Sequence, residues 1–242
     1  MVGGAAAADA IVRARRLPRL RVGLHAVLVE ARPLLPPEQI PDLVDAAGRL
    51  RTDLARLGLD ICARPSVRAQ VRWEIEAQFR AYQATGLALD HVNAHKHFHL
   101  HPAVAGDIIA IGVRYGMRGL RVPREPAAVI AEVDPSSKPG STFVAPWMRL
   151  LARRARRAGL RSPDQVFGLA WSGAMTAARL GGLLRHLPTG TTEIYTHPAT
   201  HDGLAEGAPD YRYADELAAL IDPAVIAAAR SADVMLCGYL DL

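Results

Sequence analysis

Histidines are the residues of this sequence with the clearest capacity for chemistry. Five of the nine lie in one short run, DHVNAHKHFHLHP, which spans residues 90–102. Imidazole is the commonest metal-binding side chain and the usual proton carrier near neutral pH. His95, His97 and His99 would share one face of a strand, and His95 and His99 would be neighbours in a helical turn. We therefore expect a metal or proton-transfer site here, with a solvated tract that binds metal loosely as the alternative.

Two other histidines have a similar setting. His25 lies within the apolar run LRVGLHAVLVE, and His197 follows the run TTEIY and precedes a proline. Taken alone, each is typical of a core histidine that is satisfied by a backbone carbonyl. Active sites of α/β barrels lie at the carboxyl ends of strands. Histidines at or near three strand ends therefore favour convergence on one pocket.

The elements that must position these histidines follow from the hydrophobic pattern. Short apolar runs alternate with longer amphipathic stretches, which predicts an α/β fold in one domain over residues 1–242. We expect a long loop or lid around residues 123–146, where Pro, Ser and Gly accumulate. The expected strands are 20–28, 89–94, 119–122, 192–195 and 234–240, and the expected helices are 9–16, 41–57, 67–85, 103–115, 174–186 and 222–231.

Composition excludes several classes of protein. Half of the 242 residues are hydrophobic and 22% are charged, which is ordinary for a globular chain and excludes disorder. The two cysteines cannot form a disulfide framework, so we expect a reducing, cytoplasmic compartment. The net charge of +5 comes almost entirely from arginine, which GC-rich codons favour, and aromatic residues make up only 5%. We therefore expect no nucleic-acid partner.

A basic segment, APWMRLLARRARRAGLR, predicts a different surface. A helix here would place Trp147, Leu150, Leu151 and Ala155 near one side, with five arginines nearby. Such a helix can dock on an anionic membrane, so peripheral contact with the inner membrane is one expectation. An ordinary surface helix with a solvated arginine face is the other.

Several segments together resemble one family. The segments are VGLHAVLVEARPLLPP, LDHVNAHKHFHLHPAV, GLRVPREP and TEIYTHPAT, followed by the ending DVMLCGYLDL. In this order they resemble the YdjC-type carbohydrate deacetylases, in particular the branch associated with hopanoid biosynthesis. The resemblance implies a distorted, incomplete (β/α) barrel of the polysaccharide-deacetylase-like type. It also implies one divalent metal ion (Mg or Zn) and hydrolysis of an N-acetyl group from an amino sugar, carried on a hopanoid glycolipid.

The resemblance also implies roles for individual residues. His25 and His95 would bind the metal, with His99 as a further ligand or a residue behind the ligands. His197 would be catalytic and would protonate the departing amine. Arg121 and Arg124 would orient the substrate or a catalytic carboxylate.

The chain departs from the family pattern in two places. The family has Asp-Ser-His where this chain has Asn93-Ala94-His95, and it begins with a strand ending in Asp-Asp-Phe-Gly that this sequence does not contain. Asp9 and Asp90 are not substitutes, because the first falls on a predicted helix and the second precedes His91. We expect an N-terminally truncated domain with weak metal binding and little activity.

The missing strand also leaves other expectations open. It would expose a sheet edge, and a homodimer is one way to cover such an edge. The alternatives to a deacetylase are a non-catalytic carbohydrate- or lipid-binding relative that has lost its metal site, and another metallohydrolase on the same barrel, such as a phosphoesterase.

Overall fold

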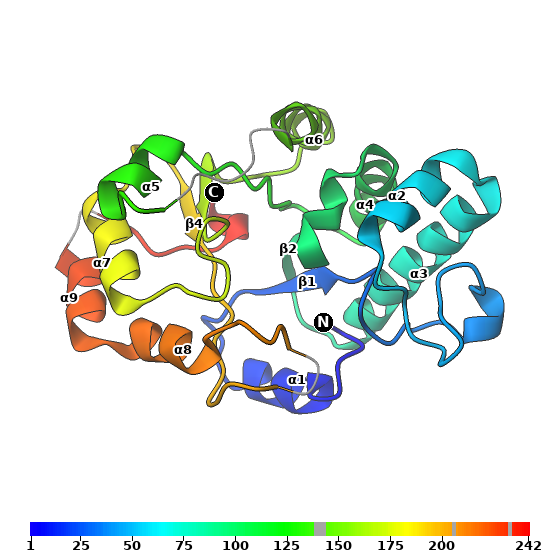
Figure 1. Ribbon diagram of the computed structural model, residues 1–242, viewed down its shortest axis with the longest axis horizontal. Coiled ribbons are helices and arrows are strands. Elements are labelled where there is room, and N and C mark those ends of the chain that lie inside the picture. The colour runs from blue at the N-terminus through cyan, green and yellow to red at the C-terminus, as the bar shows by residue number, and fades with distance from the viewer. Residues whose placement is uncertain (138–143, 205–206, 232–233) are drawn as a thin grey trace. The chain divides into compact units, whose positions relative to one another are not determined.

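The computed structural model describes residues 1–137, 144–204, 207–231 and 234–242. The chain divides into two compact units, each built from more than one segment (Figure 1). Unit 1 comprises Met1–Arg121, Val144–Ser162 and Gly238–Leu242. Unit 2 comprises Val122–Phe143 and Pro163–Cys237. Because each unit has its own strands and helices, each is described by itself.

Parallel strands form the centre of unit 1. Strand β1 (Val22–Ala26) pairs with β2 (Leu89–Ala94) in parallel. The strand predicted over 20–28 is therefore shorter than expected, and the one predicted over 89–94 is confirmed. The strand predicted over 119–122 is present only as single parallel bridges, from Leu120 to Val92 and from Gly119 to Arg161.

Helices account for most of the rest of unit 1. Helix α3 shows why the sequence folds this way, since Val67, Val71, Ile75 and Phe79 recur every four residues and are all buried. The prediction over 67–85 is confirmed. The unit contains helices α1 (Ala7–Arg15), α2 (Leu54–Ala63), α3 (Pro65–Ala84), α4 (Pro102–Arg114) and α6 (Ala145–Arg157), and 3-10 turns η1 (Pro37–Gln39), η2 (His95–Leu100) and η4 (Tyr239–Asp241).

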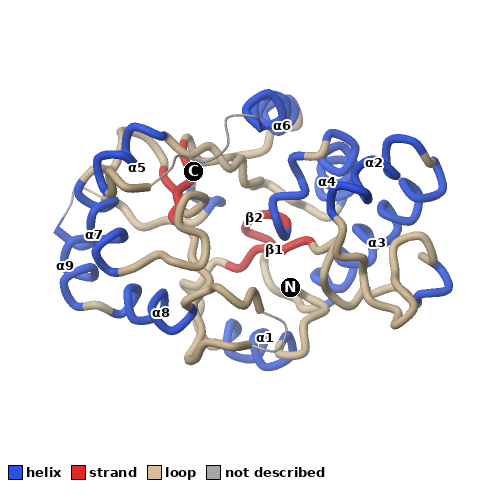
Figure 2. Tube along the Cα trace, in the orientation of Figure 1, coloured by secondary structure: helices blue, strands red, loops and turns tan. Residues whose placement is uncertain are grey.

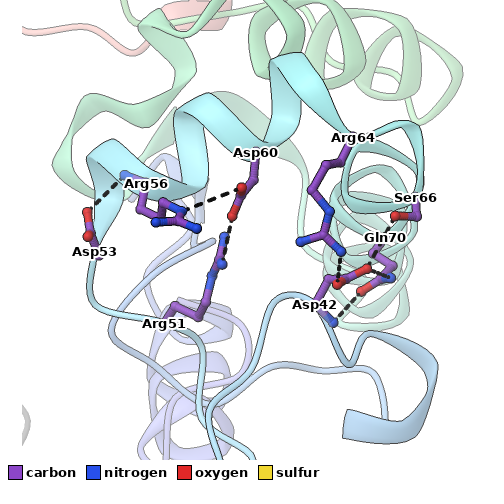
Figure 3. Close-up of polar contacts among 8 residues, drawn as sticks. All are labelled: Asp42, Arg51, Asp53, Arg56, Asp60, Arg64, Ser66 and Gln70. Carbon is purple, nitrogen blue, oxygen red and sulfur yellow. Dashed lines mark hydrogen bonds and ion pairs between the residues drawn. The ribbon is translucent and has the colours of Figure 1, made fainter.

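The helix predicted over 41–57 is wrong for most of its length, and Figure 3 shows part of the reason. Asp42 accepts hydrogen bonds from Arg64 and from Gln70 Nε2, which hold this segment as a loop (Figure 3). Asp45 then accepts the N–H of Arg49, which closes a turn of a kind that competes with helix. Helix α2 begins only after Asp53, whose carboxylate caps its first turn.

Unit 2 also combines a pair of parallel strands with helices, and it has a hydrophobic core of its own. Strand β3 (Gln165–Phe167) pairs in parallel with β4 (Thr192–Ile194), and Figure 2 shows helices around these short strands. Phe167, Trp171 and Met175 are buried in its core. The helices of the unit are α5 (Ala127–Val133), α7 (Ala177–Arg185), α8 (Tyr213–Ile221) and α9 (Pro223–Ser231).

One predicted strand is corrected. The strand predicted over 234–240 is instead an irregular stretch followed by η4. Buried Asp90 accepts the N–H groups of Tyr239 and Leu240, at 3.1 and 3.2 Å, so this backbone binds a side chain rather than a strand. The loop predicted over 123–146 contains α5, and its residues 138–143 lie outside the described part of the chain.

Short parallel strands and many helices make this an α/β fold. The described strands form two separate parallel pairs, so the incomplete barrel stays a prediction. Throughout the described ranges, every helix is too short or too polar to cross a bilayer.

Candidate functional site

Strand register brings His25 and Asn93 together. The two residues are partners in the parallel β1–β2 pair, and His25 Nδ1 lies 2.5 Å from Asn93 Oδ1. An amide oxygen can only accept, so Nδ1 carries the proton and Nε2 keeps its lone pair. Burial lowers the pKa of His25 to about 3. His25 is therefore a neutral imidazole with a free lone pair, which is the form that binds metals.

His95 lies beside His25, at the carboxyl end of β2. The two ring centroids are 5.7 Å apart and the rings meet edge to face. His95 Nε2 is 3.3 Å from Glu30 Oε2, and the same carboxylate pairs with Lys96. Burial lowers the pKa of His95 despite the carboxylate. Two of the predicted ligands thus share one location.

His99 has a different environment from the other two. It is fully buried, and its Nε2 lies 2.9 Å from the backbone oxygen of Arg121. Since a carbonyl accepts, Nε2 is the protonated nitrogen, and the buried Nδ1 is left with no hydrogen-bond partner. Burial lowers the pKa of His99 to about 3. The hydrogen bond from His99 holds the segment around Arg121 next to β2. The role of His99 as a metal ligand stays a prediction.

Arg121 is also well placed for the predicted pocket. It is 8% exposed, and its backbone N–H donates to the carbonyl of Val92 on β2. Its positive charge acts on both His25 and His99, where it further disfavours protonation. Unit 1 therefore brings His25, His95, His99 and Arg121 to one region around the carboxyl ends of β1 and β2.

A divalent metal requires more ligands than this region supplies. Nowhere in the described ranges do three or more His, Cys, Asp or Glu side chains form a group able to hold a metal ion. His25 and His95 offer two nitrogens, whereas protein metal sites of this kind use three or four ligands. The described donor set is therefore incomplete. Asn93 is also an amide, whereas a carboxylate at this position would accept the hydrogen bond from His25 Nδ1 more strongly.

His197 belongs to unit 2, where a buried carboxylate holds it. The backbone N–H of His197 donates to Glu216 Oε2, and the ring Nδ1 lies 3.8 Å from the same oxygen. Glu216 is 1% exposed, and its other oxygen accepts the N–H of Met175 at 2.9 Å. The ring of Tyr211 meets the imidazole edge to face, with 5.0 Å between centroids. His197 is therefore a positioned, partly exposed imidazole after β4.

Arg124 is the other predicted residue of unit 2. Its side chain is exposed, and Nη1 donates to the backbone oxygen of Asp164 at 3.1 Å. The next residue, Glu125, accepts the N–H groups of Gly168, Leu169 and Ala170 and so orders the turn after β3. The convergence of His197 and Arg124 with His25 and His95 stays a prediction.

Sequence reasoning did not identify the carboxylates that contact these histidines. Glu30 follows β1 in a loop, where only the structure shows its contact with His95. Glu216 lies on α8, a helix that is not among those expected from the sequence. Its spacing from Tyr213 and Ala219, both buried, was the available signal, because an acid on a buried helix face needs a partner.

Similar proteins place these features in a family. The family described as YdjC-like protein matches residues 1–231. The mouse protein named carbohydrate deacetylase is 31% identical over 265 residues, covering 100% of this chain and 84% of the mouse protein. The Geobacillus stearothermophilus carbohydrate deacetylase is 29% identical, covering 97% of this chain and 81% of that protein. A shorter match, 33% identical, covers 44% of this chain and 40% of the Brevibacillus brevis carbohydrate deacetylase.

A solved structure agrees at the level of the fold. It is described as a putative cellobiose-phosphate cleavage protein from Enterococcus faecalis V583, with a TM-score of 0.68 and 22% sequence identity. The similarity covers 96% of this chain and 82% of that one. The match over residues 1–231 settles the relationship that the histidine segments suggested. The chain belongs to the family of YdjC-like proteins.

Proposed function

We propose that this protein is a carbohydrate N-deacetylase, which hydrolyses the N-acetyl group of an amino sugar. The main support is the pair of neutral imidazoles, His25 and His95, at the ends of neighbouring parallel strands in a chain whose relatives are named carbohydrate deacetylases. The finer proposal, which rests on the resemblance alone, is an amino sugar carried on a hopanoid lipid. The proposed scaffold is an incomplete (β/α) barrel.

The proposed cofactor is one zinc or magnesium ion. When bound, such an ion would polarise the acetamide carbonyl and lower the pKa of a water molecule. His25 and His95 would be two of its ligands, and the described residues supply no third. Both proton transfers of the reaction, from the attacking water and to the leaving amine, are therefore assigned to side chains.

The reaction adds water across an amide bond. The water oxygen attacks the acetyl carbonyl carbon, the carbon–nitrogen bond breaks, and acetate leaves with the water oxygen. The sugar nitrogen must gain a proton to leave as an amine. His197 is the proposed donor, because Glu216 accepts its backbone N–H and lies 3.8 Å from its Nδ1, which positions the imidazole after β4.

Turnover is expected to be slow. A general base must take a proton from the attacking water. Glu30 is the described carboxylate that contacts His95, and it is already paired with Lys96. This engagement favours the alternative function, a carbohydrate-binding relative without catalysis, and the activity test separates the two.

The test measures acetate released from an N-acetylglucosamine oligomer, with zinc or magnesium supplied. We expect slow release by the unaltered chain and a further loss of about 10²–10⁴-fold in kcat for His197→Ala. His201→Ala is the matched control, since His201 is an exposed histidine of the same unit. Sugar binding without acetate release would support the non-catalytic function. Release that is equal in both variants would remove His197 from the reaction.

A further inference from the structure

A row of polar side chains leads from His25 along strand β2. His25 Nδ1 is 2.5 Å from Asn93 Oδ1. The other end of the same amide, Asn93 Nδ2, is 3.4 Å from His91 Nε2. His91 Nδ1 in turn is 2.9 Å from Asp90 Oδ2. We call Asp90, His91, Asn93 and His25 the polar row, and the direction of each hydrogen bond in it depends on which atom carries the proton.

The direction of these hydrogen bonds is fixed at Asp90. This side chain is 1% exposed, and its two oxygens accept the backbone N–H groups of Tyr239 and Leu240. A carboxylate has no proton to donate, so His91 Nδ1 donates to it. A neutral imidazole that donates through Nδ1 accepts through Nε2. His91 Nε2 therefore accepts from the NH₂ group of Asn93.

The amide of Asn93 transmits this direction to His25. An amide can turn either its oxygen or its NH₂ group toward a neighbour, so on its own it would permit His25 to carry the proton on either ring nitrogen. Because the NH₂ group is engaged by His91, only the oxygen faces His25. Nδ1 of His25 then donates, and Nε2 keeps the lone pair.

The ring of His91 is held in place by its neighbours. The ring of Tyr239 stacks on it, with 4.4 Å between the centroids and 17° between the planes. On β1, Gly23 leaves room for the imidazole, since a Cβ at this position would lie 2.6 Å from His91 Cε1. Both contacts oppose a rotation of the ring that would exchange its two nitrogens. The nitrogen that faces Asp90 thus stays distinct from the one that faces Asn93.

An amide beside His25 explains why such a row is needed. A carboxylate at position 93 could only accept, and it would fix the proton of His25 without a further partner. An amide fixes that proton only when another group holds it one way round. Among the described residues, His91 is the side chain that contacts the NH₂ group of Asn93.

We propose that His91 is a positioning residue, which orients the amide of Asn93 and thereby keeps the proton of His25 on Nδ1 and the lone pair on Nε2. Asp90 sets the direction by accepting from His91. That the lone pair of His25 serves a reaction rests on the proposed function. The position of the proton does not, because it follows from the hydrogen bonds alone.

The test reads the proton positions by long-range proton–nitrogen NMR of the full chain, labelled at histidine. The pH is about 8, where a histidine with the ordinary pKa is neutral. His25→Gln and His91→Gln assign the two sets of ring signals. We expect both residues of the unaltered chain to be in the Nδ1–H form alone. Neither sugar nor metal is added, so a chain that releases no acetate still gives this result.

The first variant, His91→Phe, keeps an aromatic ring but removes the acceptor for Asn93. Asp90 retains its two backbone donors, so we expect the variant to fold. The amide of Asn93 can then turn either way. We expect the single Nδ1–H form of His25 to be lost and replaced by a mixture with the Nε2–H form.

Two further variants separate the direction of the hydrogen bonds from packing. His101→Phe is the matched control, because it makes the same change in the same histidine run, at a residue that contacts Cys62. It should leave the signals of His25 unchanged. Adding Asn93→Asp to His91→Phe should restore the single Nδ1–H form of His25, because a carboxylate only accepts.

Several results would overturn the proposal. One needs no variant to fold, namely an Nε2–H form or a charged ring at His25 or His91 in the unaltered chain. Unchanged signals of His25 in His91→Phe would show that the amide is held by something else. An equal effect of His101→Phe, or a double variant that fails to restore the Nδ1–H form, would show that packing rather than hydrogen-bond direction places the proton.

Discussion

Acid should destabilise this protein through His99, because the folded chain keeps that side chain neutral. The imidazole is fully buried and donates to the backbone oxygen of Arg121. Burial lowers its pKa from 6.5 to about 3. In the unfolded chain, His99 takes up a proton as the pH falls below about 6.5. The stability that His99 provides is therefore complete above pH 6.5 and is lost progressively as the pH falls toward 3.

The size of the effect follows from the two pKa values. Each pH unit between them is worth about 1.4 kcal/mol for one proton, so acidification from about pH 6.5 to 4.5 removes about 2.7 kcal/mol through His99 alone. Half-buried His25, whose pKa is also lowered to about 3, contributes a second proton over the same window. The unaltered chain should thus show a slope that is steeper by about one proton than a chain without His99.

The measurement is urea unfolding followed by circular dichroism at a series of pH values. His99→Phe keeps an aromatic ring at this position but cannot titrate. Above about pH 6.5 it should be less stable than the unaltered chain by about 1–3 kcal/mol, because the Arg121 carbonyl is left without its donor, and this difference should shrink as the pH falls. His201→Phe, at an exposed position, is the control. The reasoning is refuted if the slope of unfolding free energy against pH is the same in His99→Phe and in the unaltered chain.

Two further predictions concern unit 2. Glu216→Gln should lower the free energy of unfolding by about 1.5–3 kcal/mol. Both carboxylate oxygens of Glu216 accept backbone N–H groups, and the NH₂ group of glutamine cannot accept one. Calorimetry should show a melting temperature lower by several degrees, and an unchanged one would contradict the assigned contacts. Gly173→Ala should destabilise more, because φ is +76° and the new Cβ would lie 2.2 Å from the ring of Tyr211. Thermal unfolding checks this, and a neutral result would mean that Tyr211 moves freely.

The elements with the strongest hydrophobic pattern could be predicted from the sequence. Strand β2 was predicted over 89–94, where the structure has it, because an apolar run is bounded by Gly86 and the histidine tract. The failure over 41–57 has a physical cause. Leu43 and Leu50 are fully buried as a helical pattern requires, but a loop buries them. Asp42 holds this loop through Arg64 and Gln70, which lie 22 and 28 residues further along the chain.

The candidate site was predictable in its residue types but less so in its contacts. That His25 and His95 lie together follows from parallel pairing of two strands whose ends carry histidines. The roles of Glu30 and Glu216 did not follow, because a carboxylate behind an imidazole is set by packing between distant segments. The sequence around each residue does not predict such a contact.

The buried carboxylate of Asp90 has a consequence for how the protein is made. It accepts backbone N–H groups from Tyr239 and Leu240, which belong to unit 1 although some 150 residues separate them from Asp90. On a translating ribosome, Asp90 emerges long before these partners exist. Until they arrive, the nascent unit holds a buried acid without its backbone donors, and such groups are costly. Unit 1 can therefore complete the contacts of this carboxylate only after residues 239 and 240 have been synthesised.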